Sequence, residues 1–194
     1  MLKEPRPGRV KTRLARGPGG LGGVGAAWWF RHASAALLRR LARDPRWEVV
    51  LAVAPDAARG SRALPSFPRI PQGRGDLGVR MARLLRGGLA RGTPVMVMGG
   101  DIPGAGPSEV AAALAALRRA DAVLAPATDG GFWLAGAAPP RAVPAGLFRG
   151  CRWSTPQALK DAAETLRPRR LACGPVLADV DEPSDLARPA RRRA

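Results

Sequence analysis

A basic turn near the start of the chain carries residue types that bind phosphate. Residues 5–14, PRPGRVKTRL, contain two prolines and Gly8, which make a stiff, tight turn whose backbone can approach a ligand closely. Lys11, Thr12 and Arg13 follow and supply an ammonium, a hydroxyl and a guanidinium. Arginine grips phosphate oxygens through paired hydrogen bonds, and lysine acts as a point charge. The turn is therefore predicted to hold phosphates, with an ordinary basic surface turn as the alternative.

A carboxylate follows an apolar run in the middle of the chain. Residues 93–99, TPVMVMG, are predicted as a buried strand, and Gly100 and Asp101 come directly after it. Ligands of open α/β sheets bind at the carboxyl ends of strands, and Mg²⁺ prefers one or two carboxylates plus substrate phosphate oxygens. Asp101 is therefore a candidate metal ligand, with a turn or helix-cap role as the alternative. Asp179 and Asp181, at the end of a predicted strand over residues 177–180, are its candidate partners.

Two glycine-rich turns could also line a binding site. Residues 72–80, QGRGDLGVR, lead into a predicted helix, where backbone amides could face an anion or a polar base edge. The alternative is a plain turn in which Asp76 caps the helix. Residues 129–131, DGG, again place an acid after a predicted strand. The candidates from these turns are Gln72, Gly75, Asp76, Arg80, Asp129 and Gly130.

Other conspicuous residues are given structural roles. Residues 20–25, GLGGVG, match the dinucleotide-binding glycine pattern, but no hydrophobic strand precedes them, so they are interpreted as a flexible approach to the first helix. His32, the single histidine, lies within a predicted helix without a partner at a useful spacing. Trp28 and Trp29 are expected to pack rather than to stack on a base.

The elements that must position these residues alternate between β-rich and helical stretches, which indicates an α/β fold with a mainly parallel sheet. Only Met1 to Lys3 precede the loop 4–14 that contains the phosphate turn (residues 5–14), so the strand expected before it is largely missing. Long loops are expected over residues 55–75 and 137–148, and a single domain over residues 1–188 with a basic tail at 189–194. Helices are predicted over residues 28–44, 76–90, 108–119 (capped by Ser108) and from Thr155-Pro156 (capped by Ser154), and strands over residues 48–54, 93–99, 122–125, 132–136 and 177–180.

Composition narrows the class of protein. Of the 194 residues 46% are hydrophobic, which suits a globular chain, and no apolar run reaches the roughly 20 residues of a membrane span. The start of the chain lacks an apolar signal stretch, and Cys151 and Cys173 are interpreted as reduced, buried thiols of a cytoplasmic protein. The formal charge of +17 comes almost wholly from arginines spread along the chain, apart from the run 191–193. It is interpreted as compositional bias rather than as a specific nucleic-acid surface.

Six segments taken in order resemble the rSAM/selenodomain-associated transferase family. This family belongs to the nucleotide-diphospho-sugar transferase (GT-A) superfamily, which includes molybdenum-cofactor and phospholactate guanylyltransferases. The resemblance covers nearly the whole chain. The segments are KEPRPGRVKTRLA (3–15), QGRGDLGVRM (72–81), GGDIP (99–103), PATDGGFWLAG (126–136), LFRGCRWSTP (147–156) and DVDEPSDL (179–186).

The resemblance implies a three-layer α/β/α sandwich with a nucleotide at the strand tips. Lys11 and Arg13 would hold the phosphates, Asp101 would bind Mg²⁺ or Mn²⁺, and Asp181 or Asp179 would add a second metal contact. Asp129 and residues 72–80 would line the nucleotide or acceptor side. Trp153 and Ser154 would shape the acceptor pocket. One departure is Gly100, where the family usually has threonine or serine.

Two reactions fit this expectation. In nucleotidyl transfer an acceptor attacks the α-phosphate of a nucleoside triphosphate and pyrophosphate leaves, whereas in glycosyl transfer a sugar moves from a nucleotide sugar to a small-molecule acceptor. Gly99 stands two residues before Asp101, so the acidic pair common in sugar transfer is absent. This absence and the basic turn favour nucleotidyl transfer slightly. A basic nucleic-acid-binding or scaffolding protein without catalysis is the third alternative.

Overall fold

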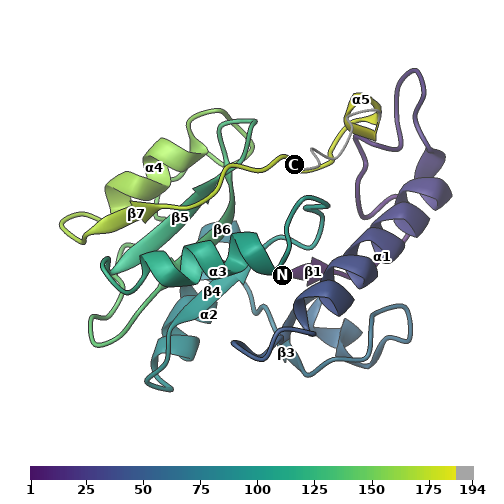
Figure 1. Cartoon of the computed structure of the whole chain (residues 1–194). Coiled ribbons are helices and arrows are strands. Elements are labelled where there is room, and N and C mark those ends of the chain that lie inside the picture. The colour runs from purple at the N-terminus through teal and green to yellow at the C-terminus, as the bar shows by residue number, and fades with distance from the viewer. Residues whose placement is uncertain (187–194) are drawn as a thin grey trace. The chain divides into compact units, whose positions relative to one another are not determined.

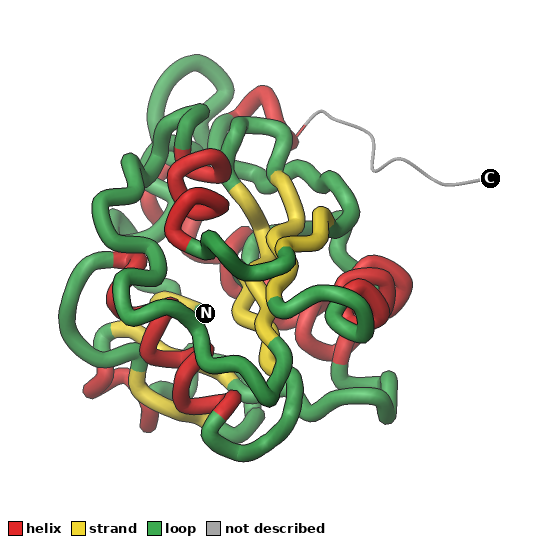
Figure 2. Tube along the Cα trace, turned by 90° about the vertical axis from the view of Figure 1, so that its left-hand side faces the viewer, coloured by secondary structure: helices red, strands yellow, loops and turns green. Residues whose placement is uncertain are grey.

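The computed structural model describes residues 1–186, so the predicted basic tail at 189–194 lies outside the described residues. The described chain divides into two compact units. Unit 1 comprises residues 1–71, 100–107 and 178–186, and unit 2 comprises residues 72–99 and 108–177. Each unit carries its own sheet, and the strands of both sheets are yellow in Figure 2.

Unit 1 contains a parallel three-stranded sheet in the order β1-β2-β3, with Leu2 of β1 opposite Val53 of β2. β1 is only two residues long, in line with the predicted shortage of sequence before the phosphate turn. Phe30 and Leu38 of the long helix α1 pack in one hydrophobic cluster with Leu2 and Val53, so α1 covers the sheet. The elements of unit 1 (Figure 1) are β1 (Leu2–Lys3), α1 (Gly22–Leu41), β2 (Leu51–Ala54), the 3-10 helix η1 (Asp56–Gly60), β3 (Arg69–Pro71) and α5 (Pro183–Leu186).

Unit 2 contains a four-stranded sheet in the order β4-β6-β5-β7. β6 runs antiparallel to both of its neighbours, and only β5 and β7 pair in parallel. The mainly parallel sheet expected from the sequence is therefore confirmed in unit 1, while the sheet of unit 2 is mixed. The elements of unit 2 are α2 (Leu77–Leu89), β4 (Val95–Met98), α3 (Pro107–Ala116), β5 (Ala122–Pro126), β6 (Phe132–Ala137), α4 (Ala158–Thr165) and β7 (Leu171–Cys173).

Several predicted element boundaries are wrong. The helix after Ser154 begins only at Ala158, because Ser154 has a φ of 60°, a left-handed conformation that differs from the extended backbone of a capping residue. Ser108 is not a cap either, since α3 already begins at Pro107. The strand predicted over residues 177–180 is reduced to one bridge between Ala127 and Leu177. The short strands β3 and β7 arise where no strand was predicted.

The start of α1 is a further correction. The helix begins at Gly22, so most of the glycine-rich segment 20–25 is helical rather than a flexible approach. Glycine weakens a helix by up to about 1 kcal/mol per residue relative to alanine. Buried Ala26, Ala27 and Phe30 follow directly and supply the packing that offsets this cost. Trp28 does not pack as expected, since 63% of its surface is exposed.

The two cysteines differ in environment. Cys151 is buried as predicted, but Cys173 is exposed, so the prediction of two buried thiols is wrong for Cys173. Burial raises the pKa of the Cys151 thiol to about 11, and the negative charges of Asp161 and Asp76 add to this rise. Since the thiolate is the reactive form, Cys151 is a poor nucleophile at neutral pH.

A thiol titration should distinguish the two cysteines. At pH 8 we expect one thiol per native chain to react rapidly with a disulfide reagent, because Cys173 is exposed while only roughly one Cys151 in a thousand is ionised. The second thiol should react only after denaturation. A Cys173→Ser variant serves as the control and should show almost no rapid reaction. Two thiols reacting at equal rates in the native protein would contradict the burial of Cys151.

No helix in the part of the chain that the structure describes is long and apolar enough to cross a membrane.

Candidate functional site

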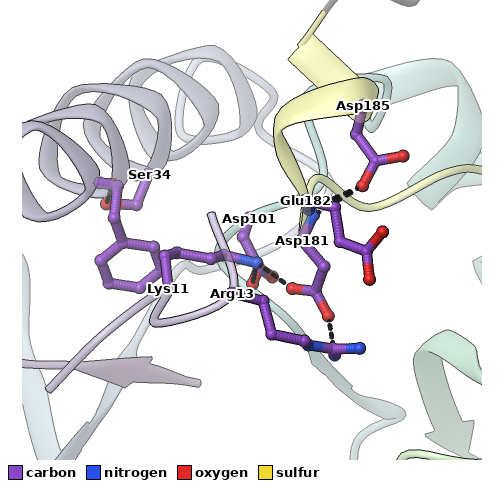
Figure 3. Close-up of polar contacts among 8 residues, drawn as sticks. Lys11, Arg13, Ser34, Asp101, Asp181, Glu182 and Asp185 are labelled. Carbon is purple, nitrogen blue, oxygen red and sulfur yellow. Dashed lines mark hydrogen bonds and ion pairs between the residues drawn. The ribbon is translucent and has the colours of Figure 1, made fainter. Parts of the chain in front are cut away.

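Three distant segments of unit 1 bring two acids and two bases together. The Lys11 ammonium donates a hydrogen bond to Oδ1 of Asp181 at 2.6 Å and forms an ion pair with Asp101. Arg13 pairs with the other carboxylate oxygen of Asp181. Figure 3 shows Lys11 between the two carboxylates, with Arg13 on the far side of Asp181. We call these four residues the charged cluster.

The phosphate turn is held by its apolar residues. Val10 belongs to the hydrophobic cluster of α1 and the sheet, and Leu14 is fully buried, so both ends of the Lys11 segment are anchored. Lys11 itself has a φ of 47°, in the left-handed region, and its side chain is only 5% exposed. A lysine in this conformation costs about 1 kcal/mol relative to glycine, so anchoring by Val10 and Leu14 is needed to hold it. Gly8 and Thr12 are exposed on the same turn.

Packing within unit 1 explains why glycine precedes Asp101. A Cβ atom added to Gly100 would lie 2.1 Å from a methyl carbon of Leu2, so threonine or serine at this position would require Leu2 to move. The segment after Asp101 is tied to α1 by Arg40, which donates to the carbonyl oxygens of Pro103 at 2.9 Å and Ala105 at 3.0 Å. The chain is therefore held in place on both sides of Asp101, by packing at Gly100 and by the hydrogen bonds of Arg40.

Asp181 is positioned by a carboxylate that sequence reasoning did not single out. Asp185 accepts hydrogen bonds from the backbone amides of Asp181 at 3.0 Å and Glu182 at 2.9 Å. The turn into the four-residue helix α5 is closed by these bonds, which are visible in Figure 3. Asp179 lies two residues earlier, and the carboxylate that contacts Lys11 and Arg13 is that of Asp181. The sequence signal for Asp185 was its place three residues after Glu182, a spacing that suits a turn-closing acid.

Removing the Asp185 carboxylate should loosen Asp181. We expect Asp185→Ala to lower the free energy of unfolding by about 1 kcal/mol, the usual cost of losing a side-chain cap on backbone amides, which corresponds to about 2–4 °C in Tm. Asp185→Asn, which keeps one acceptor oxygen, is the matched control. A wild-type Tm in Asp185→Ala would show that the turn holds without Asp185.

The cluster keeps Lys11 charged. Burial alone would lower the pKa of Lys11, but the negative charge of Asp101 and the hydrogen bonds to Asp101 and Asp181 outweigh it, and the pKa is raised. The ammonium is therefore fully protonated at neutral pH. Because the folded pKa is the higher one, this contribution to stability is complete below the ordinary lysine pKa and is lost only as the pH rises through the folded value.

A pocket of about 860 Å³ opens beside the phosphate turn, also within unit 1. The basic side chains of Lys3, Arg6 and Arg9 line it together with the buried acid Glu4. Hydrogen bonds from Ser61 and Arg6 lower the pKa of Glu4, so this carboxylate is ionised at neutral pH. Ala54, Pro55, Ala57 and Ala58 give the pocket an apolar wall at the carboxyl end of β2.

Sequence reasoning missed this pocket, because its lining comes from β1, the phosphate turn and η1 together. The residues KEPRPGR were visible as a basic stretch, but nothing in the sequence placed Ser61 beside Glu4. Arg9 lines the pocket and Lys11, two residues later, belongs to the charged cluster. One turn therefore serves both features.

The candidates in the turn before α2 brace that turn within unit 2. Asp76 caps α2 by accepting from the amide of Val79 at 2.8 Å, as its structural alternative predicted. Arg80 donates to the side-chain oxygen of Gln72 at 2.8 Å, and Gln72 is almost fully buried. Gly75 has a φ of 107°, which suits glycine. These contacts make the turn rigid.

The remaining candidates of unit 2 also have local structural roles. Asp129 accepts from the amide of Gly131 at 2.9 Å and closes the turn between β5 and β6. Gly130 in that turn has a φ of 88°, and a Cβ atom added to it would lie 2.5 Å from backbone atoms of Pro156. Trp153 packs in an aromatic group with Phe132 and Phe148, and Ser154 follows it. The candidates thus form two sets, one assembled in each unit.

The cluster suits a divalent cation that is shared with substrate. Within residues 1–186, no group of three or more histidine, cysteine, aspartate or glutamate side chains could hold a metal ion by itself. Two carboxylates that converge on one ammonium nitrogen could instead supply two oxygens, which is the number of protein ligands that Mg²⁺ takes beside phosphates. Asp101 and Asp181 therefore fit such an ion, provided that Lys11 moves from between them.

Comparison with known proteins places the chain in a family. Residues 37–155 match the family described as "Uncharacterized protein conserved in bacteria (DUF2064)". The chain belongs to this family. A DUF2064 assignment carries no reaction of its own, and no curated protein matches the chain in sequence.

A solved structure supports the fold of this DUF2064 protein. The crystal structure of a candidate nucleotide-diphospho-sugar transferase from Desulfovibrio desulfuricans G20 is similar at a TM-score of 0.81 and 31% sequence identity. The match covers 93% of this chain and 80% of that chain. The chain is therefore an α/β protein of the nucleotide-diphospho-sugar transferase fold, as its sequence predicted.

Proposed function

We propose that this protein is a metal-dependent transferase that uses a nucleotide donor. The observation that carries the proposal is the charged cluster, in which Lys11 and Arg13 meet Asp101 and Asp181 at one point. Acids for a divalent cation and bases for phosphate oxygens are the two sets of groups that transfer from a nucleotide needs. The similar structure, itself a candidate nucleotide-diphospho-sugar transferase, supports the same class of donor.

Each residue has a definable task in this proposal. Asp101 and Asp181 would hold Mg²⁺ or Mn²⁺, and a bound cation would neutralise charge on the leaving phosphate oxygens. Lys11 and Arg13 would bind the phosphate chain. The apolar wall of the 860 Å³ pocket and its basic rim would take the nucleoside and the adjoining phosphates, with Arg9 nearest to the cluster in sequence. Asp185 would position Asp181 through its two amide bonds.

Nucleotidyl transfer is the reaction that we favour. Arg6, Arg9, Lys11 and Arg13 concentrate four positive charges in eight residues, which fits a triphosphate better than a diphosphate. Glycosyl transfer from a nucleotide sugar is the second candidate, and the description of the similar structure favours it. In both cases the other substrate would be a small molecule, and the proposed place of action is the cytoplasm, where nucleotide donors are made. Membership of the rSAM/selenodomain-associated transferases within the superfamily belongs to the same proposal.

A ligand panel tests the function. Thermal unfolding is measured with nucleoside triphosphates and nucleotide sugars, each with and without Mg²⁺. A ligand at about 100 times its Kd adds roughly 2.7 kcal/mol, or about 5–10 °C at this chain length. A Mg²⁺-dependent shift supports the proposal, and the absence of a shift with every nucleotide for a folded protein would refute it.

The product then decides the reaction. Release of pyrophosphate from the triphosphate that gave the shift supports nucleotidyl transfer, and release of a nucleoside diphosphate from a nucleotide sugar supports glycosyl transfer. Binding of duplex DNA that collapses between low and moderate salt, without a nucleotide shift, would instead indicate the nucleic-acid alternative.

A further inference from the structure

We propose that Lys11 is a tethered cation that occupies the place of the metal between Asp101 and Asp181, so that the site accepts metal and nucleotide only together. This inference rests on the proposed function and adds an order of binding to it. Its basis is geometric: one ammonium nitrogen is bound to both carboxylates, at 2.6 Å to Asp181 and in direct ion-pair contact with Asp101. Asp101 and Asp181 could not hold a metal ion between them while Lys11 occupies both carboxylates.

Charge balance strengthens the argument. Lys11 and Arg13 together neutralise Asp101 and Asp181, so the cluster carries no net charge before any ligand arrives. A free Mg²⁺ ion would approach a neutral group of charges whose centre is an ammonium, and would have to give up its own tightly held water. The positive charge of Lys11 therefore already offsets the electrostatic attraction that normally draws a divalent cation to a pair of carboxylates.

Burial makes Lys11 hard to dislodge without a replacement partner. Its side chain is 5% exposed, while those of Asp101 and Asp181 are 25% and 27% exposed. The Lys11 side chain is thus more deeply buried than either acid, and moving its ammonium away from both carboxylates without another anion would leave a buried charge unpaired. Arg13, with 60% of its side chain exposed, is free of this constraint and serves mainly as a surface partner of Asp181.

A metal–nucleotide complex removes the obstacle because it brings both partners for an exchange. Asp101 and Asp181 would hold its divalent cation, while Lys11 and Arg13 would bind its phosphate oxygens. The anchors Val10 and Leu14 keep the turn in place, so that only the flexible lysine side chain must swing. The number of ion pairs would thus stay the same. A free metal ion would leave Lys11 without an anion, and a free nucleotide would leave the two carboxylates without a cation.

The test measures metal binding directly, apart from catalysis. Mn²⁺ is titrated into the full protein without nucleotide, and free Mn²⁺ is followed by electron paramagnetic resonance. We expect weak binding to the wild type and at least about tenfold tighter binding to Lys11→Met, because the methionine keeps the length of the side chain without its charge. Lys11→Gln is the second variant if Lys11→Met folds poorly. Lys11→Arg, which retains the charge, should bind Mn²⁺ as weakly as the wild type.

Controls separate this inference from the proposed function. Lys160→Met removes an exposed lysine of α4 and should leave Mn²⁺ binding unchanged. If folded Lys11→Met and Lys11→Gln bind free Mn²⁺ no better than the wild type, Lys11 is a structural ion-pair partner and the inference is wrong, even where the wild type still shows a Mg²⁺-dependent nucleotide shift. If the wild type shows no such shift with any nucleotide, it is the proposed function that fails.

Discussion

Replacement of Asp101 by asparagine should abolish the Mg²⁺-dependent stabilisation of the protein by a nucleotide. Asparagine keeps the shape of the side chain but loses the charge that pairs with Lys11 and that we propose binds the metal. The shift of about 5–10 °C expected for the wild type at saturating ligand should disappear, and turnover should fall by about 100-fold or more. Differential scanning fluorimetry with a triphosphate, with and without Mg²⁺, measures the first effect.

The control for Asp101→Asn is a carboxylate of the same unit with a different partner. Asp44 pairs with Arg46 at 2.5 Å and has no contact with the charged cluster. Asp44→Asn should therefore keep the full Mg²⁺-dependent shift. Because Asp101→Asn also removes one partner of buried Lys11, the Tm of each variant without ligand is recorded first. A shift of wild-type size in folded Asp101→Asn would remove Asp101 from the metal site.

Replacement of Gly130 by alanine should destabilise the protein strongly, with no ligand present. The φ of 88° disfavours any side chain, and an added Cβ would lie 2.5 Å from backbone atoms of Pro156, which cannot rotate away. A left-handed alanine costs about 1–2 kcal/mol, and overpacking adds about 1–3 kcal/mol. We expect a loss of about 3 kcal/mol, or a fall of about 6–12 °C in Tm, measured by circular dichroism.

A second glycine provides the comparison. A Cβ atom added to Gly146 would have no heavy atom within 4 Å, and Gly146 lacks a positive φ. The Tm of Gly146→Ala should therefore lie within a degree or two of the wild-type Tm. Gly130 was predicted from the sequence as a ligand-binding residue. If Gly130→Ala keeps the wild-type Tm but loses nucleotide binding, the predicted ligand-binding role of Gly130 is correct and the structural role proposed here is wrong.

The sequence predicted the main helices and the acids and bases that meet in unit 1. The turn at residues 5–14 could be recognised as a candidate site because the apolar Val10 and Leu14 flank three polar residues. The structure shows why this pattern is present, since both apolar side chains are buried and anchor the turn. Asp101 and Asp181 could be interpreted because each follows an apolar run. Their meeting at Lys11 could only be inferred from family resemblance, since nothing local encodes a contact across 170 residues.

The features that escaped prediction are short or depend on long-range packing. β3 and β7 have three residues each, too few to show the alternating pattern of a strand, and β3 ends in a proline. β6 runs antiparallel to β5 because the short turn at Asp129 reverses the chain. The sequence of that turn did not reveal this direction, since it is also compatible with other connections between strands. Gly100 was noted only as a departure from the threonine or serine of the family, whereas the closeness of Leu2 leaves no room for a side chain at this position.

The distribution of the cluster along the chain has a consequence for biosynthesis. Of the cluster, Lys11 and Arg13 leave the ribosome first, Asp101 follows about 90 residues later, and Asp181 with its support Asp185 follows about 80 residues after that. Protein chains emerge amino-terminus first, and contacts between distant residues form last. A nascent or truncated chain that stops before residue 178 would leave Lys11 with Asp101 alone and Arg13 without its carboxylate partner. The complete charged cluster therefore forms only after Asp181 has been synthesised, and a copy that lacks Asp181 carries one uncompensated positive charge there.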